Sequence, residues 1–205
     1  MSALFRGIIG AAIVVVVGIP AASAQESGIP PVPAVEMSGG YTFMRDFSSD
    51  LAEDLNFPAG WYASTAVNVN RWFGVVGEVT GSYKNDLKLG LEEMGMSSDA
   101  QVYTFMGGPR FAAKTGRLMP FAQFLAGAAH LRATVNMPEQ IPGYFSTSDT
   151  QFAFQPGGGL NVLLTNNLGV HIAGDYRCIV DFEGENTYSN QFRFLTGFLF
   201  NWGAR

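Results

Sequence analysis

Residues Gln191–Gly203 read QFRFLTGFLFNWG, and large apolar side chains alternate along them with polar or small ones. Successive side chains of a β-strand point to opposite faces of the sheet, so this period of two predicts a strand with one apolar face. The stretch is longer than the about five or six residues usual for soluble strands, and it reaches the about nine to eleven that cross a bilayer at a tilt. Its apolar set is Phe192, Phe194, Phe198, Phe200 and Trp202, opposite Gln191, Arg193, Gly197 and Asn201.

The same alternation recurs upstream and gives eight predicted strands in all. The other seven cover approximately Val35–Met44, Gly60–Val69, Trp72–Tyr83, Ala100–Ala113, Met119–Ala133, Gln151–Leu164 and Leu168–Ile179. The gaps switch between short ones, Asn68–Arg71, Lys114–Arg117 and Thr165–Asn167, and long ones, approximately Arg45–Phe57, Lys84–Ser98, Asn136–Thr150 and Asp181–Asn190. Antiparallel hairpins with tight turns at one end and long loops at the other are typical of outer-membrane barrels.

The apolar faces must point outward. They carry bulky and aromatic side chains, which the inside of eight strands is too narrow to hold. Hydrophobic residues make up 47% of the chain and charged residues only 14%, which suits a lipid-facing exterior. We therefore predict an all-β fold, an eight-stranded antiparallel up-and-down transmembrane β-barrel. Its ends and three short turns should lie on the periplasmic side, and its four long loops should be extracellular.

A targeting segment precedes the strands. Ile8–Ile19 is an apolar run, and Ala22–Ala24 resembles a small-residue cleavage site. The run is too short to span a bilayer comfortably as a helix, although an uncleaved anchor is the alternative. The prediction is a signal peptide over residues 1–24, a proline-rich periplasmic leader over 25–34 and the barrel over 35–205. The single cysteine, Cys178, excludes a disulfide within the chain.

Several short segments resemble a known family, the small OmpA/OmpX-type, porin-like outer-membrane β-barrel domains. These segments are Gly107–Phe111, Pro120–Gln123, Pro156–Asn161, Gly174–Arg177 and Gln191–Gly203. The resemblance implies the outer membrane of a Gram-negative bacterium, with membrane lipid and lipopolysaccharide as neighbours and the barrel-assembly machinery as a partner during insertion. Such barrels usually end in an aromatic residue, whereas the last aromatic here, Trp202, is followed by three more residues.

The inward faces collect polar and charged side chains. They are Glu36, Glu78, Arg110, Gln123, Asn161, His171, Asp175, Arg177 and Arg193. Isolated charges inside a narrow barrel would be costly, so we expect these groups to pair and hydrogen-bond. The cluster has two interpretations, a structural ion-pair core and the gate of a narrow pore that opens when the pairs exchange partners.

Aromatic residues near the predicted strand ends form a second set. They are Tyr41, Trp61, Trp72, Tyr83, Phe111, Phe121, Phe192 and Trp202. Rings at these positions are typical of the two aromatic girdles at the membrane interfaces. Packing inside a soluble barrel is the alternative, and the glycine-rich opposite faces argue against it.

The sequence gives no support for catalysis or a cofactor. Neither His130 nor His171 is followed two residues later by the serine of the lipid-A deacylase pattern, and no phosphate loop, zinc spacing or dinucleotide fingerprint occurs. The net charge of −5 argues against nucleic-acid binding. Most carboxylates lie in the predicted long loops. One interpretation is a set of solvated surface groups, and the alternative is divalent-cation bridging to lipopolysaccharide phosphates or contact with a basic partner.

We therefore expect a monomeric, non-enzymatic barrel with a structural or surface-interaction role in the envelope. The alternatives are a narrow small-solute porin, a lipid-modifying enzyme and a soluble lipocalin-like binder. The strand registers near Pro109, Pro120 and Pro156 are open, because each proline lacks a ladder donor and a closed barrel has no edge to place it on.

Overall fold

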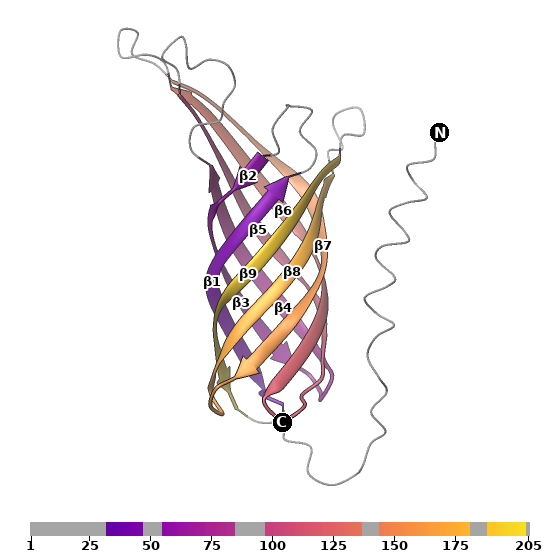
Figure 1. Cartoon of the computed structure of the whole chain (residues 1–205). Helices are drawn as coiled ribbons and strands as arrows, with labels where there is room; N and C mark the ends of the chain where they lie inside the picture. The colour runs from indigo at the N-terminus through magenta and orange to yellow at the C-terminus, as the bar shows by residue number, and fades with distance from the viewer. Residues whose placement is uncertain (1–31, 47–54, 85–96, 137–143, 181–187, 204–205) are drawn as a thin grey trace, which may run out of the picture.

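The computed structural model describes residues 32–46, 55–84, 97–136, 144–180 and 188–203, which form one closed β-sheet (Figure 1). The predicted signal peptide lies outside these residues. Among them, no helix is long and apolar enough to cross a membrane. The strands are β1 Val35–Asp46, β2 Leu55–Phe57, β3 Ala59–Asn68, β4 Phe73–Lys84, β5 Ser97–Ala112, β6 Leu118–Asn136, β7 Tyr144–Leu163, β8 Leu168–Val180 and β9 Tyr188–Trp202.

Eight strands span the barrel, as the alternation predicts. Each pairs antiparallel with the next along the chain, and β1 pairs with β9 from Val35↔Trp202 to Asp46↔Gln191 to close the sheet. The short β2 pairs with the end of β1 that β3 leaves unpaired, and Pro58 separates it from β3. The first predicted long loop therefore contains a short strand that the alternation did not indicate.

Three tight hairpins close one end of the barrel. Val69 N donates to Phe73 O at 2.9 Å in the first, and Leu164 N donates to Leu168 O at 2.9 Å in the third. The middle turn carries Gly116 at φ 60°, a left-handed conformation that suits glycine. The start of β1 and the end of β9 lie at this same end, which is the predicted periplasmic side (Figure 1).

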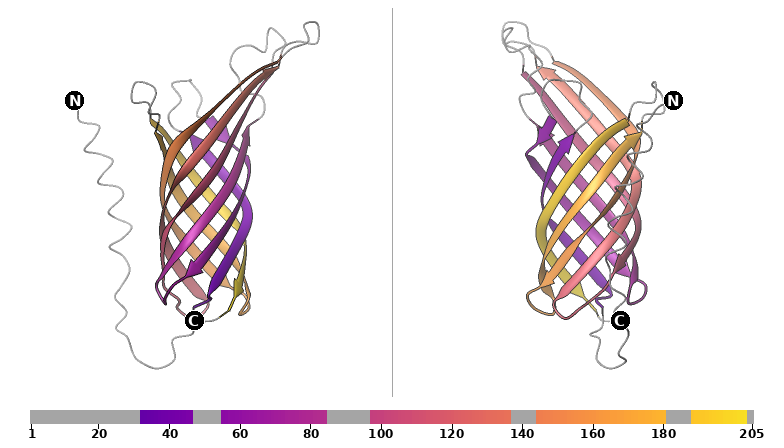
Figure 2. Two further views of the ribbon diagram at one scale, coloured as in Figure 1. Left: turned by 180° about the vertical axis from the view of Figure 1, so that it is seen from behind. Right: turned by 45° about the vertical axis from the view of Figure 1, so that its right-hand side comes forward.

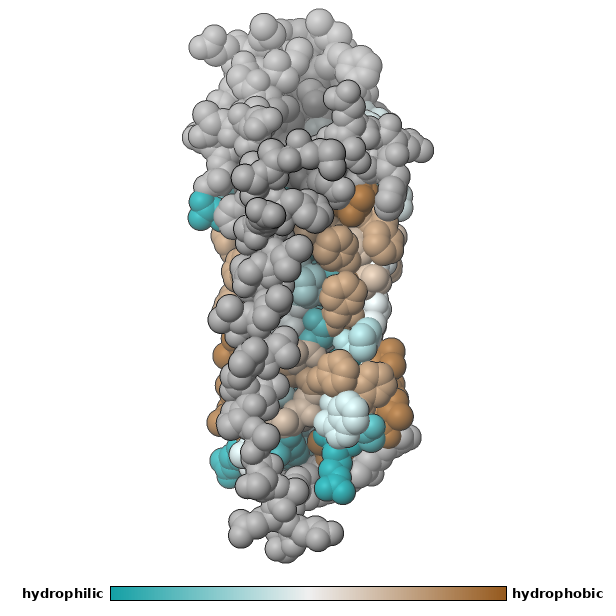
Figure 3. Space-filling view, turned by 90° about the vertical axis from the view of Figure 1, so that its right-hand side faces the viewer, coloured by the Kyte–Doolittle hydropathy of each residue, from teal (hydrophilic) through white to brown (hydrophobic). Residues whose placement is uncertain are grey.

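The outward faces are apolar, as predicted, whereas the inward faces mix polar and small side chains with large apolar ones such as Leu125 and Leu195. Exposed Phe198, Phe200 and Trp202 alternate with buried Leu199 and Asn201 on β9. Hydrophobic side chains dominate the described part of the wall in Figure 3. On β4 the outward residues run from Phe73 to Tyr83, and ten residues at about 3.3 Å each and a tilt of about 40° span about 25 Å, the height of the apolar band of such barrels.

Three strands continue beyond the barrel rim. The β6–β7 ladder runs to Asn136↔Tyr144, whereas β8 pairs with β7 only from Phe152↔Val180 onward. The extended β5, β6 and β7 lean away from the barrel as a separate blade (Figures 1 and 2).

The predicted loop Asn136–Thr150 was therefore wrong over Tyr144–Thr150, which are the first residues of β7. The predicted strand ends at Ala100, Ala133 and Gln151 were correspondingly too short. Residues 146–150 are all exposed, so they have no apolar face and no alternation to reveal them. We call the part of these three strands beyond the rim the blade. On β7 it comprises Tyr144–Gln151, which pair with β6 but not with the described residues of β8.

Two of the three prolines lie at breaks in single ladders. β5 pairs with β6 up to Gly107↔Ala126 and resumes at Arg110↔Gln123, so Pro109 falls in the interruption. Pro156 falls in a similar interruption between β7 and β8. Both interruptions skip equal numbers of residues on the two strands, so neither proline marks the extra residue of a bulge. Pro120 lies near the start of β6 and pairs with Leu160.

Candidate functional site

A buried polar network fills the middle of the barrel. Arg193 Nη1 donates to Glu78 Oε1 at 3.0 Å and to Gln155 Oε1 at 2.6 Å. Gln155 Nε2 donates to Glu78 Oε1 at 3.2 Å and to Asp175 Oδ2 at 3.0 Å, and Arg177 Nε donates to Gln155 Oε1 at 2.9 Å. Four strands, β4, β7, β8 and β9, supply these side chains. The network links two acids and two arginines through one glutamine, and we call it the central network.

The central network is deeply buried and not fully hydrogen-bonded. Arg177 and Arg193 are 0% exposed, and the two acids at most 4%. Arg177 Nη1, Arg193 Nε, Arg193 Nη2 and Asp175 Oδ1 have no hydrogen-bond partner among the described residues. Gln123 bonds to Asp175, and Arg177 Nη2 also reaches Thr104 Oγ1 at 3.1 Å. The donors left over could therefore serve a second arrangement of the same pairs.

A second network lies nearer the tight-turn end. Glu36 Oε2 accepts from Arg110 Nη2 at 3.0 Å and from Asn161 Nδ2 at 2.9 Å, while Asn68 Nδ2 donates to Glu36 Oε1 at 2.7 Å. His171 Nδ1 lies 2.7 Å from Asn161 Oδ1. The predicted interior residues thus divide between two networks rather than forming one cluster.

Phe121 belongs to this second network and not to a membrane girdle. It is 6% exposed, its ring stacks on His171 at 5.2 Å, and the Arg110 guanidinium lies 4.2 Å from its centroid. The prediction of Phe121 as an interfacial aromatic was therefore wrong. Its position has the inward parity of Gln123 and Leu125, and it fills space that the small side chains opposite leave open.

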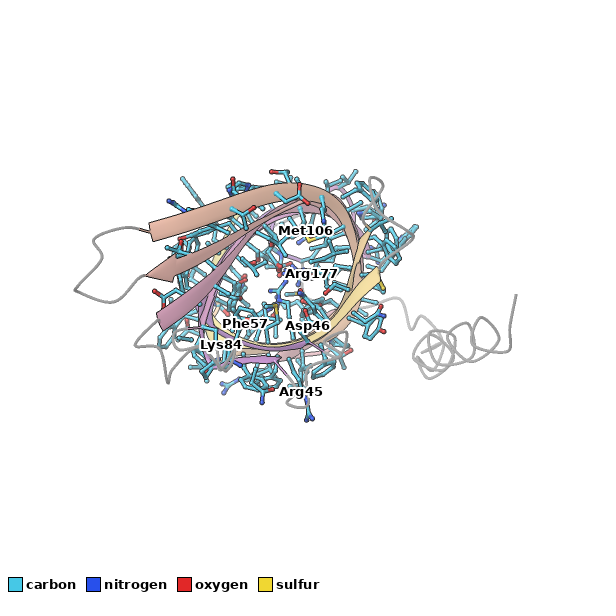
Figure 4. The ribbon with its side chains drawn as sticks, turned by 90° about the horizontal axis from the view of Figure 1, so that it is seen from above. Arg45, Asp46, Phe57, Lys84, Met106 and Arg177 are labelled. Carbon is cyan, nitrogen blue, oxygen red and sulfur yellow. The ribbon has the colours of Figure 1, made fainter. Side chains whose placement is uncertain are left out.

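Apolar side chains occupy the end of the barrel away from the tight turns. Met44, Phe57 and Val102 form a buried cluster there, with Leu131 packed against it. Seen down the axis, Phe57 and Arg177 point into the barrel (Figure 4). Side chains therefore fill the described interior at three successive levels.

The other predicted aromatics lie on the outer wall, at its two ends. Trp72, Phe111 and Trp202 lie beside the tight turns, and Trp72 stacks on Phe111 at 5.8 Å. The remainder lie toward the opposite rim, and they are Tyr41, Trp61, Tyr83 and Phe192.

Sequence reasoning missed the residue at the centre of the site. Gln155 hydrogen-bonds to all four charged members of the central network. The sequence predicts only that its side chain points inward. Asn68 and Thr104 were likewise given inward positions without a role. Parity alone shows which way a side chain points, whereas its partners depend on the register around the whole barrel.

The comparisons with known proteins agree with this geometry. The family described as "Outer membrane protein beta-barrel domain" matches residues 9–200. The chain belongs to this family. It is accordingly a protein of the bacterial outer membrane. No curated protein matches the chain in sequence.

Solved structures show the same fold. The attachment invasion locus protein Ail of Yersinia pestis, in complex with the heparin analogue sucrose octasulfate, superposes with a TM-score of 0.57 at 20% identity, over 82% of this chain and 99% of that one. Neisserial surface protein A superposes with a TM-score of 0.61 at 12% identity, over 82% and 97%. Identities this low establish the fold and leave the role of this family member to its own residues.

Proposed function

We propose that this protein is a non-enzymatic barrel of the outer membrane that holds a surface-interaction element, the blade, outside the cell. The observation that carries the proposal is the edge of β7. Residues Tyr144–Gln151 pair with β6 on one side and have no β8 partner among the described residues on the other. A strand edge of this kind can accept an added strand from another protein.

The direction of the β7 backbone identifies the groups available at this edge. Leu163 N donates to Arg117 O on the β6 side, so odd-numbered residues of the unbroken β6–β7 ladder face β6 and even-numbered ones face away. Pro156, which lacks an N–H, has the away-facing parity and lies where the β8 ladder is interrupted. Ser146 and Ser148 therefore direct their amides to the unpaired edge.

The packed interior supports an anchoring role for the barrel. Two polar networks and the Met44–Phe57–Val102 cluster fill the described interior with interlocked side chains. Such a core supports a rigid closed sheet, because every buried charge has at least one partner of opposite charge or a hydrogen-bonding amide.

A proline substitution at the edge tests the surface-interaction role. The full-length protein in lipid nanodiscs is screened against a displayed library of ten-residue peptides, and selected peptides are measured against two variants. Ser148→Pro removes an edge donor without removing a β6–β7 hydrogen bond and should weaken binding at least tenfold, whereas Ser148→Ala, which keeps the amide, should bind like the wild type. N-methylation of alternate peptide amides should also abolish binding. Unchanged binding to Ser148→Pro, or insensitivity to N-methylation, would show that the edge is not the interaction element.

A narrow gated pore is the second candidate function. The unpartnered Arg177, Arg193 and Asp175 atoms favour it, because they could pair differently in an open state. Planar-bilayer recordings separate the two candidates. Silence at all voltages is expected for the anchoring role, and reproducible unitary steps would favour the pore.

A further inference from the structure

Five outward side chains form a compact patch where the barrel rim meets the base of the blade. They lie on four neighbouring strands, β3 to β6, and we call them the rim patch: Trp61, Tyr83, Tyr103, His130 and Arg132. The register places Tyr103 opposite His130, and Gln101 between Tyr83 and Arg132. The patch presents three aromatic rings beside one imidazole and one guanidinium.

Contacts within the patch fix its aromatic half. Trp61 Nε1 donates to the Tyr83 hydroxyl at 3.0 Å, and the Tyr83 and Tyr103 rings meet edge to face at 5.8 Å. Gly81 makes this possible, because a Cβ there would lie 2.7 Å from Trp61 Nε1 and 3.0 Å from the Tyr83 hydroxyl. The rings are therefore held against the wall in a defined arrangement.

The basic half is oriented by hydroxyls of the blade. His130 Nδ1 lies 2.8 Å from Thr150 Oγ1, which leaves Nε2 directed away from that contact. Arg132 is exposed, and its Nε donates to Ser146 Oγ at 3.4 Å. The outer ends of the imidazole and the guanidinium are thus presented on one surface.

The height of the patch matches the headgroup layer of the outer leaflet. Leu118 is the first outward residue of β6 and is 47% exposed at the tight-turn end. At about 3.3 Å per residue and a tilt of about 40°, His130 and Arg132 lie about 30 and 35 Å above it, while the apolar band is about 25 Å tall. The basic groups therefore lie just beyond the acyl chains, with the rings at the boundary.

The surrounding charges leave the basic half accessible from the membrane side. Asp99 shares the outward face of β5 with Gln101 but lies two residues farther from the membrane. Asp149 has the opposite parity and holds Gln151 Nε2 at 2.7 Å. Asp149 thus points to the other face, and Asp99 lies at the side of the patch that is farther from the membrane.

We propose that the rim patch binds the phosphorylated disaccharide headgroup of an outer-leaflet glycolipid of the lipid A type. Arg132 and His130 contact a phosphate, because a guanidinium donates paired hydrogen bonds to phosphate oxygens. The rings of Trp61, Tyr83 and Tyr103 contact the sugar face and the first acyl carbons, as aromatic side chains with a polar tip do at membrane interfaces. A phosphate without the disaccharide would use only half of this surface.

Lipid titrations on the full-length, detergent-solubilised barrel test the proposal by native mass spectrometry. The probes are diphosphoryl lipid A, monophosphoryl lipid A and phosphatidylglycerol. The wild type should bind diphosphoryl lipid A at least tenfold more tightly than phosphatidylglycerol, with monophosphoryl lipid A between them. Equal affinity for phosphatidylglycerol would overturn the glycolipid assignment.

Matched variants locate the site. Arg132→Gln with His130→Gln should weaken diphosphoryl lipid A binding about tenfold, and Trp61→Leu should reduce the preference for lipid A over phosphatidylglycerol. Arg117→Gln, which removes an exposed charge at the opposite end of the barrel, should stay within twofold of the wild type. Heat-dependent gel migration confirms that each variant is folded. Wild-type binding by the double variant, or an equal loss in Arg117→Gln, would overturn the proposal.

Discussion

Glu78→Gln is expected to destabilise the barrel strongly while leaving it closed. Glu78 is 4% exposed and accepts from Arg193 Nη1 and from Gln155 Nε2. After the change, Arg177 and Arg193 share a single acid, Asp175, and all three side chains are buried. Removing one partner of a buried pair costs about 3–5 kcal/mol, and because glutamine keeps one acceptor oxygen we expect about 3 kcal/mol.

The loss is measured by urea unfolding of the protein in lipid vesicles, followed by tryptophan fluorescence. Asp149→Asn removes an exposed acid and should change the free energy of unfolding by less than about 0.5 kcal/mol. Combining Glu78→Gln with Arg193→Met removes the uncompensated charge and should recover part of the stability. A loss below about 1 kcal/mol, or unitary conductance appearing in Glu78→Gln alone, would refute the interpretation of the central network as a structural core.

Two further changes test the packing and the turns. Gly157→Ala should cost about 2–4 kcal/mol in the same unfolding assay, because its Cβ would overlap the Asp175 carboxylate, whereas Gly77→Ala, with nothing within 4 Å, should cost less than about 1 kcal/mol; equal losses would contradict this. Asn70→Ala should cost about 1 kcal/mol and slow refolding little, because its Oδ1 accepts from two backbone amides of the first tight turn, at 3.0 and 2.9 Å; no loss of stability would mean that water replaces both bonds.

The alternation of side chains predicted the spanning strands and the direction of their side chains, because the membrane determines both. A strand with lipid on one side and a packed interior on the other must alternate, so the eight spanning strands and the inward direction of Glu36, Glu78 and Arg193 follow from parity. The division of these residues into two networks does not follow from it. That division depends on shear between strands far apart in the chain, such as β4 and β9, which contribute Glu78 and Arg193 to one ion pair.

Parity failed where the environment is the same on both faces. The blade has water on both sides over residues 146–150, so its Ser-Thr-Ser-Asp-Thr sequence resembles a loop while its backbone is a strand. The prediction for Phe121 failed for a different reason. An aromatic residue near a strand end suggests a girdle, yet the inward parity of Phe121 places it over Arg110 and His171, where cation–π and stacking contacts replace lipid.

One carboxylate, that of Asp149, already occupies a backbone donor at the blade edge. Thr150 has the away-facing parity, and its amide donates to Asp149 Oδ1 at 2.7 Å. The carboxylate thus occupies a donor that an added strand would need and places a negative charge beside it. Asp149→Ala frees the amide, and one net hydrogen bond is worth about 0.5–1.5 kcal/mol. Peptides selected on the wild-type edge should therefore bind Asp149→Ala about three- to tenfold more tightly.

The control, Thr147→Ala, alters a residue whose amide faces β6 and should not change affinity. Because edge strands are commonly protected by charges, a gain confined to Asp149→Ala would identify this carboxylate as that protection, and weaker binding would instead make Asp149 a contact for the peptide.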